Sequence, residues 1–171
     1  EQGTAFGDRY NRGLLKGIPN DDTSADMYDL TLSLCEDRGL VSYEVSNYAH
    51  QGYESIHNLI YWRYGDYIGI GPGAHGRLTI DGKKYATETV LSPEAWLKKV
   101  ECDGSGESNS VVLTDQQQAA EFVMMGLRLK EGINYQRFKN LSGSAFSKTK
   151  LNFLKDLNLI EEKDGYIATT N

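Results

Sequence analysis

The residues best suited to chemistry stand together in the segment His57-Asn58-Leu59-Ile60-Tyr61-Trp62. A neutral imidazole can ligate haem iron axially, and flat rings such as those of Tyr61 and Trp62 can lie against the faces of a porphyrin. Arg63 and Arg77 follow and could pair with propionate carboxylates. The combination suits a large planar ligand better than it suits a packed core.

A structural interpretation competes with this one. A lone histidine in an arbitrary sequence more often caps a turn, with the neighbouring aromatic side chains in a core. Seven of the 25 residues from Tyr43 to Tyr67 are Tyr or Trp. This aromatic content favours the ligand site, but the structural interpretation is still preferred from these residues alone. His50 could be a second iron ligand, although a place in a surface loop is the simpler expectation for it.

A glycine-dense turn follows the aromatic segment. Gly71-Pro72-Gly73-Ala74-His75-Gly76 matches the GxGxxG dinucleotide fingerprint literally, but that fingerprint requires a helix after the glycines. Here a hairpin is expected instead, so we reject a dinucleotide site. What remains is steric, because glycines let the backbone approach a ligand or another strand closely.

The elements that must position these residues alternate between helix and strand. We expect a helix that begins near Asp21-Asp22-Thr23 and ends at Gly39, then a strand over Val41–Val45. A short strand is expected over residues 67–70 and a hairpin around Asp81-Gly82, with strands over 77–80 and 83–87. Ser92-Pro93-Glu94 should open a further helix. This rhythm is typical of an α/β layer or barrel.

A second module is expected after a polar, glycine-rich linker at residues 103–111. Thr114-x-x-Gln117 is a capping box for a helix that runs through Leu129. Two shorter helices, around 134–141 and 144–157, and a hairpin around Asp164-Gly165 complete a pattern that resembles a winged helix. We therefore divide the chain into residues 1–102, the linker and residues 112–171.

The composition narrows the function classes. The 171 residues carry a net charge of -6, which argues against a general polyanion binder. Lys148, Lys150 and Lys155 could face phosphates, but the basic surface is thin, and we expect no nucleic-acid partner. No apolar run could span a bilayer and no signal peptide opens the chain, so a reducing cytoplasm is expected for Cys35 and Cys102. No GxSxG, HExxH or Walker loop is present.

Several motifs appear in an order that resembles a known family. They are Glu1-Gln2-Gly3-Thr4, Ala25-Asp26-Met27-Tyr28, Tyr43-Glu44-Val45-Ser46-Asn47-Tyr48-Ala49, His57-Asn58-x-x-Tyr61-Trp62-Arg63-Tyr64-Gly65-Asp66-Tyr67 and Gly69-Ile70-Gly71-Pro72-Gly73-Ala74-His75-Gly76. Together they resemble the C-terminal half of the oxygen-independent coproporphyrinogen III oxidase-like radical SAM proteins, and most of all the HemW-type haem chaperone branch. The chain, which has no initiator Met, is then expected to be a C-terminal piece of a longer protein.

The resemblance implies a fold and cofactors. The fold class would be α/β: the end of a partial (β/α) barrel that binds S-adenosylmethionine and a [4Fe–4S] cluster, followed by a small winged-helix-like helical domain. The cluster cysteines of the family, a CxxxCxxC motif, are absent from this sequence. Ala49 matches a position beside S-adenosylmethionine, and the turn at Gly71, Gly73, Ala74 and His75 falls where the family closes the barrel over that cofactor.

The resemblance also implies a function. The haem-binding HNxxYW motif of the chaperone branch is intact as His57, Asn58, Tyr61 and Trp62, with His57 as the ligand of the haem iron. The expected function is to bind haem and pass it to acceptor proteins, membrane-associated ones among the candidates. The alternative is a coproporphyrinogen III oxidase of porphyrin biosynthesis. Whether the whole protein is an enzyme stays open, and we expect this fragment alone to be inactive.

Overall fold

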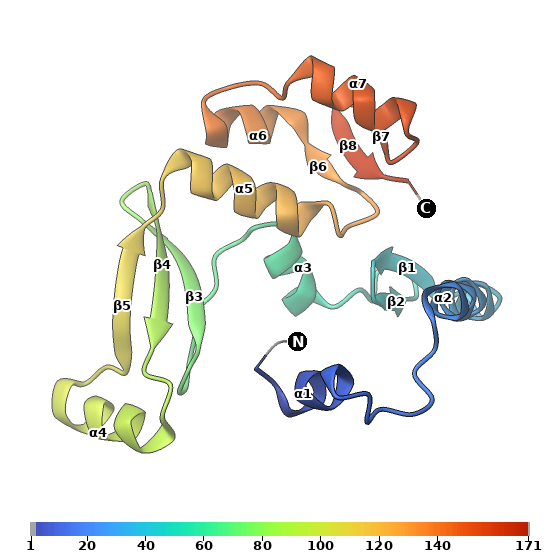
Figure 1. Cartoon of the computed structure of the whole chain (residues 1–171). Coiled ribbons are helices and arrows are strands. Elements are labelled where there is room, and N and C mark those ends of the chain that lie inside the picture. Colours follow the sequence, from blue (N-terminus) through green and yellow to red (C-terminus); the bar gives the residue numbers. More distant parts are fainter. Residues whose placement is uncertain (1–2, 171) are drawn as a thin grey trace. The chain divides into compact units, whose positions relative to one another are not determined.

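The computed structural model describes residues 3–170 (Figure 1). The chain divides into two compact units, Glu1–Val41 and Ser42–Asn171. The first unit holds α1 (Ala5–Asn11) and α2 (Asp21–Glu36). The motif residues Glu1 and Gln2 lie outside the described residues. The predicted helix near residue 21 is confirmed in α2.

The start of α2 differs from the expectation by one residue. The cap is Asn20, whose side-chain oxygen accepts the Thr23 N–H at 2.8 Å. Asp21 and Asp22 therefore occupy the first turn, where negative charge stabilises the positive end of the helix dipole. The apolar positions of α2 do recur at helical spacing, but they are exposed: Met27, Leu30 and Leu34.

The second unit begins with the elements that carry the aromatic motif. β1 (Val41–Glu44), which starts at the boundary residue, and β2 (Asn47–Ala49) form a two-stranded sheet, which confirms the predicted strand. α3 (Ile56–Trp62) follows and is capped by Ser55, whose hydroxyl accepts the Asn58 N–H at 3.3 Å. Serine at this position satisfies one of the N–H groups that the first helical turn leaves unpaired.

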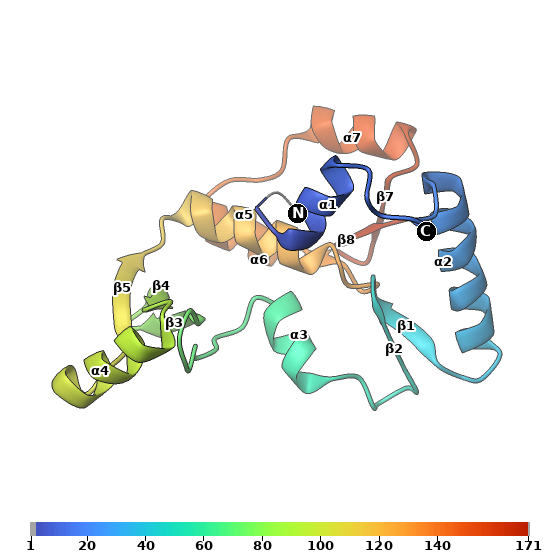
Figure 2. The same cartoon turned by 60° about the horizontal axis from the view of Figure 1, so that its bottom comes forward.

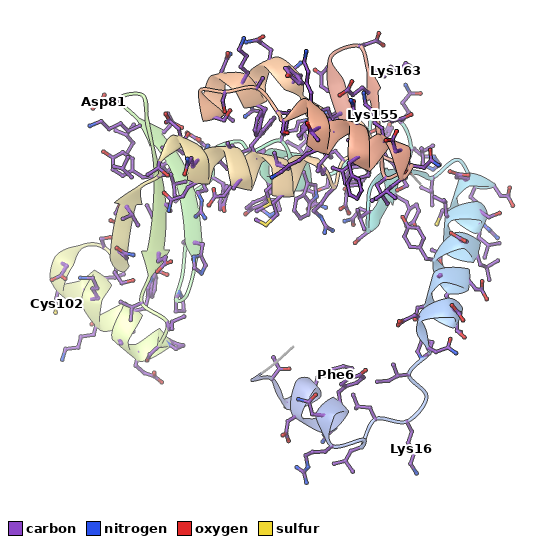
Figure 3. The ribbon with its side chains drawn as sticks, turned by 45° about the horizontal axis from the view of Figure 1, so that its top comes forward. Phe6, Lys16, Asp81, Cys102, Lys155 and Lys163 are labelled. Atoms are coloured by element: carbon purple, nitrogen blue, oxygen red, sulfur yellow. The ribbon has the colours of Figure 1, made fainter. Side chains whose placement is uncertain are left out.

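An antiparallel sheet comes next, in the order β3-β4-β5. β3 (His75–Ile80) and β4 (Lys83–Thr89) are joined by Asp81 and Gly82, both at positive φ, as a two-residue hairpin turn requires. This confirms the predicted hairpin, and Asp81 is visible at its tip in Figure 3. α4 (Pro93–Asp103), capped by Ser92, leads to the third strand.

One expectation fails in this region. Much of the predicted linker, residues 103–111, belongs to β5 (Glu107–Val112), which pairs with β4. Every residue of β5 is exposed, so the sequence lacks the alternation of apolar and polar residues that predicts a strand. The strand is defined by its backbone pairing with β4. β3, β4 and β5 pair antiparallel, whereas barrel strands are parallel, so these three strands are not barrel strands. The assignment of residues 1–102 to the end of a barrel stays a prediction.

The remaining elements form the C-terminal part, and its predicted helices and hairpin are confirmed. They are α5 (Asp115–Gly126), β6 (Ile133–Asn134), α6 (Tyr135–Ser142), α7 (Lys148–Asp156), β7 (Ile160–Lys163) and β8 (Tyr166–Thr169). The capping box at Thr114 and Gln117 opens α5, although the helix ends at Gly126 and not at Leu129. The strands pair in the order β6-β8-β7, and three helices with such a hairpin are the pattern expected of a winged helix.

The main core lies in this part of the chain. Its buried members are Tyr64, Phe122, Ile133, Leu151, Ile160 and Ile167. Close packing of β6 against β8 depends on Gly132, because a Cβ there would lie 2.1 Å from the carbonyl oxygen of Ile167. In the two views of Figures 1 and 2, α5 leads from β5 toward the β6-β8-β7 sheet. No helix within residues 3–170 is long and apolar enough to cross a membrane.

Candidate functional site

The four HNxxYW residues lie on two neighbouring faces of α3. Residues four apart share a helix face, so His57 lies with Tyr61, and Asn58 lies with Trp62. The His57 side chain is exposed and meets the Tyr61 ring edge-on, with ring centroids 4.8 Å apart. Within residues 3–170 neither nitrogen of His57 has a hydrogen-bond partner. The imidazole is therefore available to an external ligand.

The other face of α3 is turned toward the protein. Asn58 donates from Nδ2 to the Tyr43 hydroxyl of the β1 strand at 3.2 Å. The Trp62 ring is half-buried and carries the Arg128 guanidinium 4.4 Å from its centroid. Asn58 and Trp62 thus have structural contacts, whereas His57 and Tyr61 present the open side of the motif.

The C-terminal end of α3 is fixed by Arg137 of α6. Its Nη1 donates to the Arg63 carbonyl at 2.7 Å and its Nη2 to the Tyr64 carbonyl at 3.2 Å. Burial lowers the pKa of Arg137. These bonds satisfy carbonyls that the end of a helix leaves unpaired. The helix that carries the histidine is therefore tied to the C-terminal part of the chain.

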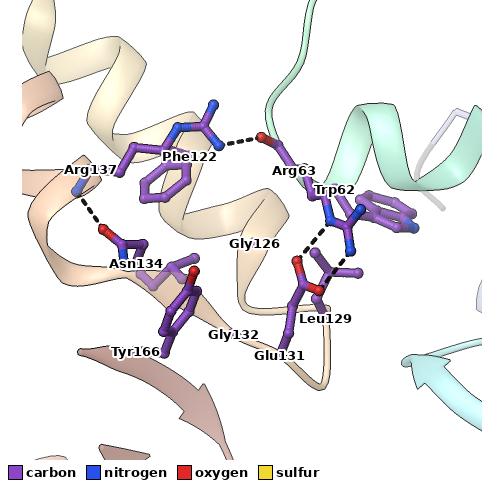
Figure 4. A pocket seen from close by; sticks show the side chains of 11 residues that line it. Trp62, Arg63, Phe122, Gly126, Leu129, Glu131, Gly132, Asn134, Arg137 and Tyr166 are labelled. Carbon is purple, nitrogen blue, oxygen red and sulfur yellow. Dashed lines mark hydrogen bonds and ion pairs between the residues drawn. The ribbon is translucent and has the colours of Figure 1, made fainter. Parts of the chain in front are cut away.

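A pocket of about 620 Å³ adjoins this end of α3 (Figure 4). Its lining residues are Trp62, Arg63, Phe122, Gly126, Leu129, Glu131, Gly132, Ile133, Asn134, Arg137 and Tyr166. His57 is not among them. The pocket and the exposed side of α3 that carries His57 are therefore separate features.

The two arginines expected to pair with propionates already have carboxylate partners. Arg63 donates to both oxygens of Glu131, at 2.8 and 2.7 Å, and Arg77 donates to Glu121 at 3.0 and 2.8 Å. The bond to Glu131 raises the pKa of Arg63, and the bond to Glu121 raises that of Arg77. The expectation that these guanidinium groups are free for a ligand is not supported, because non-local partners occupy them.

A charged cluster that the sequence did not reveal lies behind Arg77. Lys84 is buried, with Nζ 2.7 Å from Oδ1 of Asp66 and 4.4 Å from the centre of the Tyr64 ring. Burial raises the pKa of Tyr64, and the neighbouring Glu121 carboxylate raises it further. Burial alone would also raise the pKa of Asp66, but the bonds from Lys84 and Thr79 outweigh it and the pKa is lowered.

Polar backbone groups of the glycine turn form hydrogen bonds with residues 89 and 90 of the same chain. The Thr89 hydroxyl lies 2.5 Å from the Gly71 carbonyl and 2.8 Å from the Ala74 N–H, and the Gly73 N–H donates to Val90. A strand and not a helix follows the turn, so the helix that the dinucleotide fingerprint requires is not formed here. Residues 67–70 do not form the expected strand, since only Tyr67 bridges to Arg77.

The residues expected beside S-adenosylmethionine are placed separately. His75 is exposed at the start of β3, with Nδ1 3.8 Å from a Glu88 oxygen. Ala49 ends β2, and no hydrogen bond described within residues 3–170 joins it to the turn. Gly69 and Gly76 serve the close approach of backbone segments, because a Cβ on Gly69 would lie 2.4 Å from the His75 carbonyl oxygen.

Metal ligands are not gathered anywhere in the described part of the chain. Within residues 3–170, no group of three or more His, Cys, Asp or Glu side chains could hold a metal ion. Cys35 and Cys102 are free thiols in separate elements. These residues do not fit an iron–sulfur cluster.

Exposed apolar side chains on α3 and just before it were not predicted from the sequence. Tyr53, Ile56 and Ile60 are 84%, 75% and 38% exposed. The spacing of Ile56 and Ile60, four residues apart beside the histidine, could have indicated a second apolar position on this side of the helix. Ile56, His57, Ile60 and Tyr61 form what we call the open face of α3.

Comparison with known proteins places this geometry in a family. A family model described as the HemN C-terminal domain matches residues 113–171. The chain is 38% identical over 149 residues to radical S-adenosyl methionine domain-containing protein 1, mitochondrial, of Danio rerio, a match that covers 85% of this chain and 33% of that protein. It is 32% identical over 174 residues to the heme chaperone HemW of Bacillus subtilis, covering 100% of this chain and 45% of that protein.

Two further similarities agree with these. The heme chaperone HemW of Lactococcus lactis is 37% identical over 86% of this chain and 37% of its own length. The solved structure of coproporphyrinogen III oxidase (HemN) from Escherichia coli, a radical SAM enzyme, matches with a TM-score of 0.64 over 92% of this chain and 40% of that chain. At 15% identity, this second likeness concerns the fold alone.

The chain spans only about a third of the Danio rerio protein and less than half of the two HemW proteins. Identities of 32–38% nevertheless extend over most of this chain, and they include the segments that build β1, β2, α3 and the glycine turn. The chain therefore belongs to the family of radical SAM proteins that includes the HemW heme chaperones and radical S-adenosyl methionine domain-containing protein 1, and residues 113–171 match the HemN C-terminal domain.

Proposed function

We propose that this protein binds haem on the open face of α3, with His57 as the axial ligand of the iron. The observation that carries the proposal is the exposed imidazole of His57, whose ring nitrogens have no hydrogen-bond partner within residues 3–170. A neutral imidazole nitrogen donates its lone pair to iron. An available nitrogen on a fixed helix meets that requirement.

The surroundings of His57 fit a porphyrin. Ile56 and Ile60 expose apolar surface next to His57 on the helix, and a macrocycle bound through the iron would cover part of it. Tyr61 is held against both His57 and Tyr67, with ring centroids 4.8 and 4.3 Å apart. A ring fixed in this way can contact the ligand at little cost in side-chain entropy.

The fate of the haem is part of the proposal. Haem would be cargo that the protein passes to acceptor proteins, membrane-associated ones among the candidates. Two of the relatives are heme chaperones by name, which supports this direction of function. A ligand held at an exposed helix face, and not deep in a cavity, remains within reach of a second protein.

Binding of S-adenosylmethionine at Ala49 and at the turn with Gly71, Gly73, Ala74 and His75 is a further proposal. That cofactor, reduced by a cluster, supplies radical chemistry. Around Gly71 there is open space, which would admit a ligand close to the backbone. Calorimetric titration with S-adenosylmethionine should give saturable heat that His75→Ala reduces, and a wild-type titration without heat would contradict the assignment.

The haem proposal is tested by titrating the protein with haem and recording the Soret band. His57→Ala should shift the band and weaken binding by tenfold or more, roughly the loss of 1.4 kcal/mol. His75→Ala is a matched control, because it removes another exposed histidine that lies off α3. If His57→Ala binds haem with the spectrum and affinity of the wild type, the ligand assignment is wrong.

A further inference from the structure

We propose that Arg128 is a positioning residue for α3, holding Trp62 in place through an ion pair with the buried carboxylate of Glu44. The inference rests on the proposed haem function, since its consequence is the orientation of His57. It also assigns Trp62 a role other than contact with the porphyrin.

The anchor of this arrangement is the Glu44 carboxylate, which is fully buried (0% exposed) at the end of β1. It accepts hydrogen bonds from the Ser46 N–H at 3.0 Å, from Nδ2 of Asn47, and from Nη2 of Arg128 at 3.2 Å. The Arg128 side chain is 36% exposed, but its loss would leave the buried Glu44 charge without this cation, which is costly. Arg128 is therefore not free to leave this position.

The backbone around Arg128 is fixed to the same strand. Its carbonyl accepts the Val45 N–H at 3.1 Å, and the next residue, Leu129, bridges to Glu44. Nη2 of Arg128 also lies 3.4 Å from the Ser46 hydroxyl. Contacts with β1 and the turn that follows it therefore fix the orientation of the guanidinium group independently of α3.

Trp62 rests on that plane, with its ring centroid 4.4 Å from Cζ of Arg128. Stacking of this kind is stronger when water is excluded, and Trp62 Nε1 and Arg128 Nε are both buried without an acceptor within residues 3–170. One face of the indole is therefore covered by protein, and turning the ring would break the stacking.

The stacking bears on His57 because α3 has only seven residues, Ile56–Trp62. A rotation of the helix about its axis that moved Trp62 off Arg128 would turn His57 away from its present direction. Besides the contacts at the C-terminal end, the Asn58 bond to Tyr43 also resists this rotation on the inner face. Arg128 thus links the Tyr43–Ala49 segment to the helix that presents the imidazole.

The test compares four forms of the protein. Arg128→Met removes the cation but keeps an apolar side chain; Glu44→Gln with Arg128→Met also removes the buried charge that the first variant leaves unpaired. Arg12→Met is the matched control, because Arg12 makes only an exposed pair with Asp8. Each form is titrated with haem, unfolded by heat, and measured for tryptophan fluorescence in a Trp96→Phe background, where Trp62 alone emits.

We expect Arg128→Met to weaken haem binding by about tenfold, with the Soret maximum unchanged because His57 still ligates the iron. Trp62 emission should shift to the red as water reaches the indole. The double variant should regain thermal stability but not haem affinity. If Arg128 had a merely structural role, both properties would be restored together. Arg12→Met should match the wild type in every measurement.

Haem affinity of Arg128→Met within about twofold of the wild type would overturn the proposal. If Arg128→Met does not fold, the haem affinity of the double variant is compared with that of the wild type by the same criterion. Restored haem affinity in the double variant would also overturn it, because general destabilisation would then be the cause. If the wild type binds no haem, the proposed function fails, and the position of Trp62 is still judged by its emission in Arg128→Met.

Discussion

Replacing Glu121 by Gln should weaken the connection between the β3-β4-β5 sheet and α5. Glu121 lies on α5 and accepts from Nε and Nη2 of Arg77 on β3, at 3.0 and 2.8 Å. Both side chains are only 20% exposed. The amide of Gln keeps one acceptor oxygen but loses the charge and the second acceptor, so the two-bond geometry cannot be reproduced.

The expected loss follows from the degree of burial. Exposed ion pairs contribute about 0–1 kcal/mol, and breaking a fully buried pair costs about 3–5 kcal/mol. A two-bond pair with one-fifth of each side chain exposed lies between these limits, so Glu121→Gln should lower the free energy of unfolding by roughly 2 kcal/mol near neutral pH. Glu131→Gln is the matched control: its pair with Arg63 is 46–51% exposed and should contribute less than about 1 kcal/mol.

The effect should also depend on pH. Burial alone would raise the pKa of Glu121, but the bond from Arg77 and the nearby Lys84 outweigh it, and the pKa lies below its ordinary value of 4.5. A carboxyl group with a lowered pKa stabilises the fold above the ordinary value and loses this contribution as the pH falls through the folded-state pKa. The difference between wild type and Glu121→Gln should therefore shrink under acid conditions.

Urea unfolding followed by circular dichroism measures these quantities. The wild type, Arg77→Met, Glu121→Gln and the double variant form a double-mutant cycle, and the coupling energy near pH 7 should clearly exceed about 0.5 kcal/mol. A coupling below that value would refute the interpretation of the pair as a strong connection. An unchanged coupling near pH 3 would refute its electrostatic origin.

Three further substitutions test the packing. Gly132→Ala should destabilise the protein by roughly 3 kcal/mol or more, because its Cβ would lie 2.1 Å from the Ile167 carbonyl oxygen. Gly143→Ala is the control: it has the same φ of 69° but lies in open space, so it should cost only about 1 kcal/mol. Equal losses in thermal unfolding would contradict the steric explanation. Ile133→Ala, at 2% exposure, should cost about 2–5 kcal/mol in urea unfolding, and a loss below about 1 kcal/mol would place Ile133 outside the core. Thr114→Ala should cost about 1 kcal/mol by removing the capping box of α5, and unchanged stability would show that the cap contributes nothing.

Local signals in the sequence predicted most of the elements. Ser92 before Pro93 and Thr114 before Gln117 marked helix starts that the structure places at those caps. Asp81-Gly82 marked the β3–β4 hairpin. Each of these signals acts between residues at most four positions apart, which is why the sequence displays it directly.

Non-local partners could not be predicted in the same way. Arg63 meets Glu131 from 68 positions away and Arg77 meets Glu121 from 44, so both arginines seemed free for a ligand. β5 was missed because its exposed residues show no alternation of apolar and polar side chains, and the strand is defined by its pairing with β4. The sequence analysis did not predict a helix over the HNxxYW residues, and only the structure separates the open face of α3 from the inner face that Arg128 covers.

The most direct test of the central claim is resonance Raman spectroscopy of the ferrous haem complex. We predict an iron–imidazole stretching band in the wild type that is retained in His75→Ala and lost in His57→Ala. A band that survives in His57→Ala would show that another ligand holds the iron, and the open face of α3 would not be the haem site.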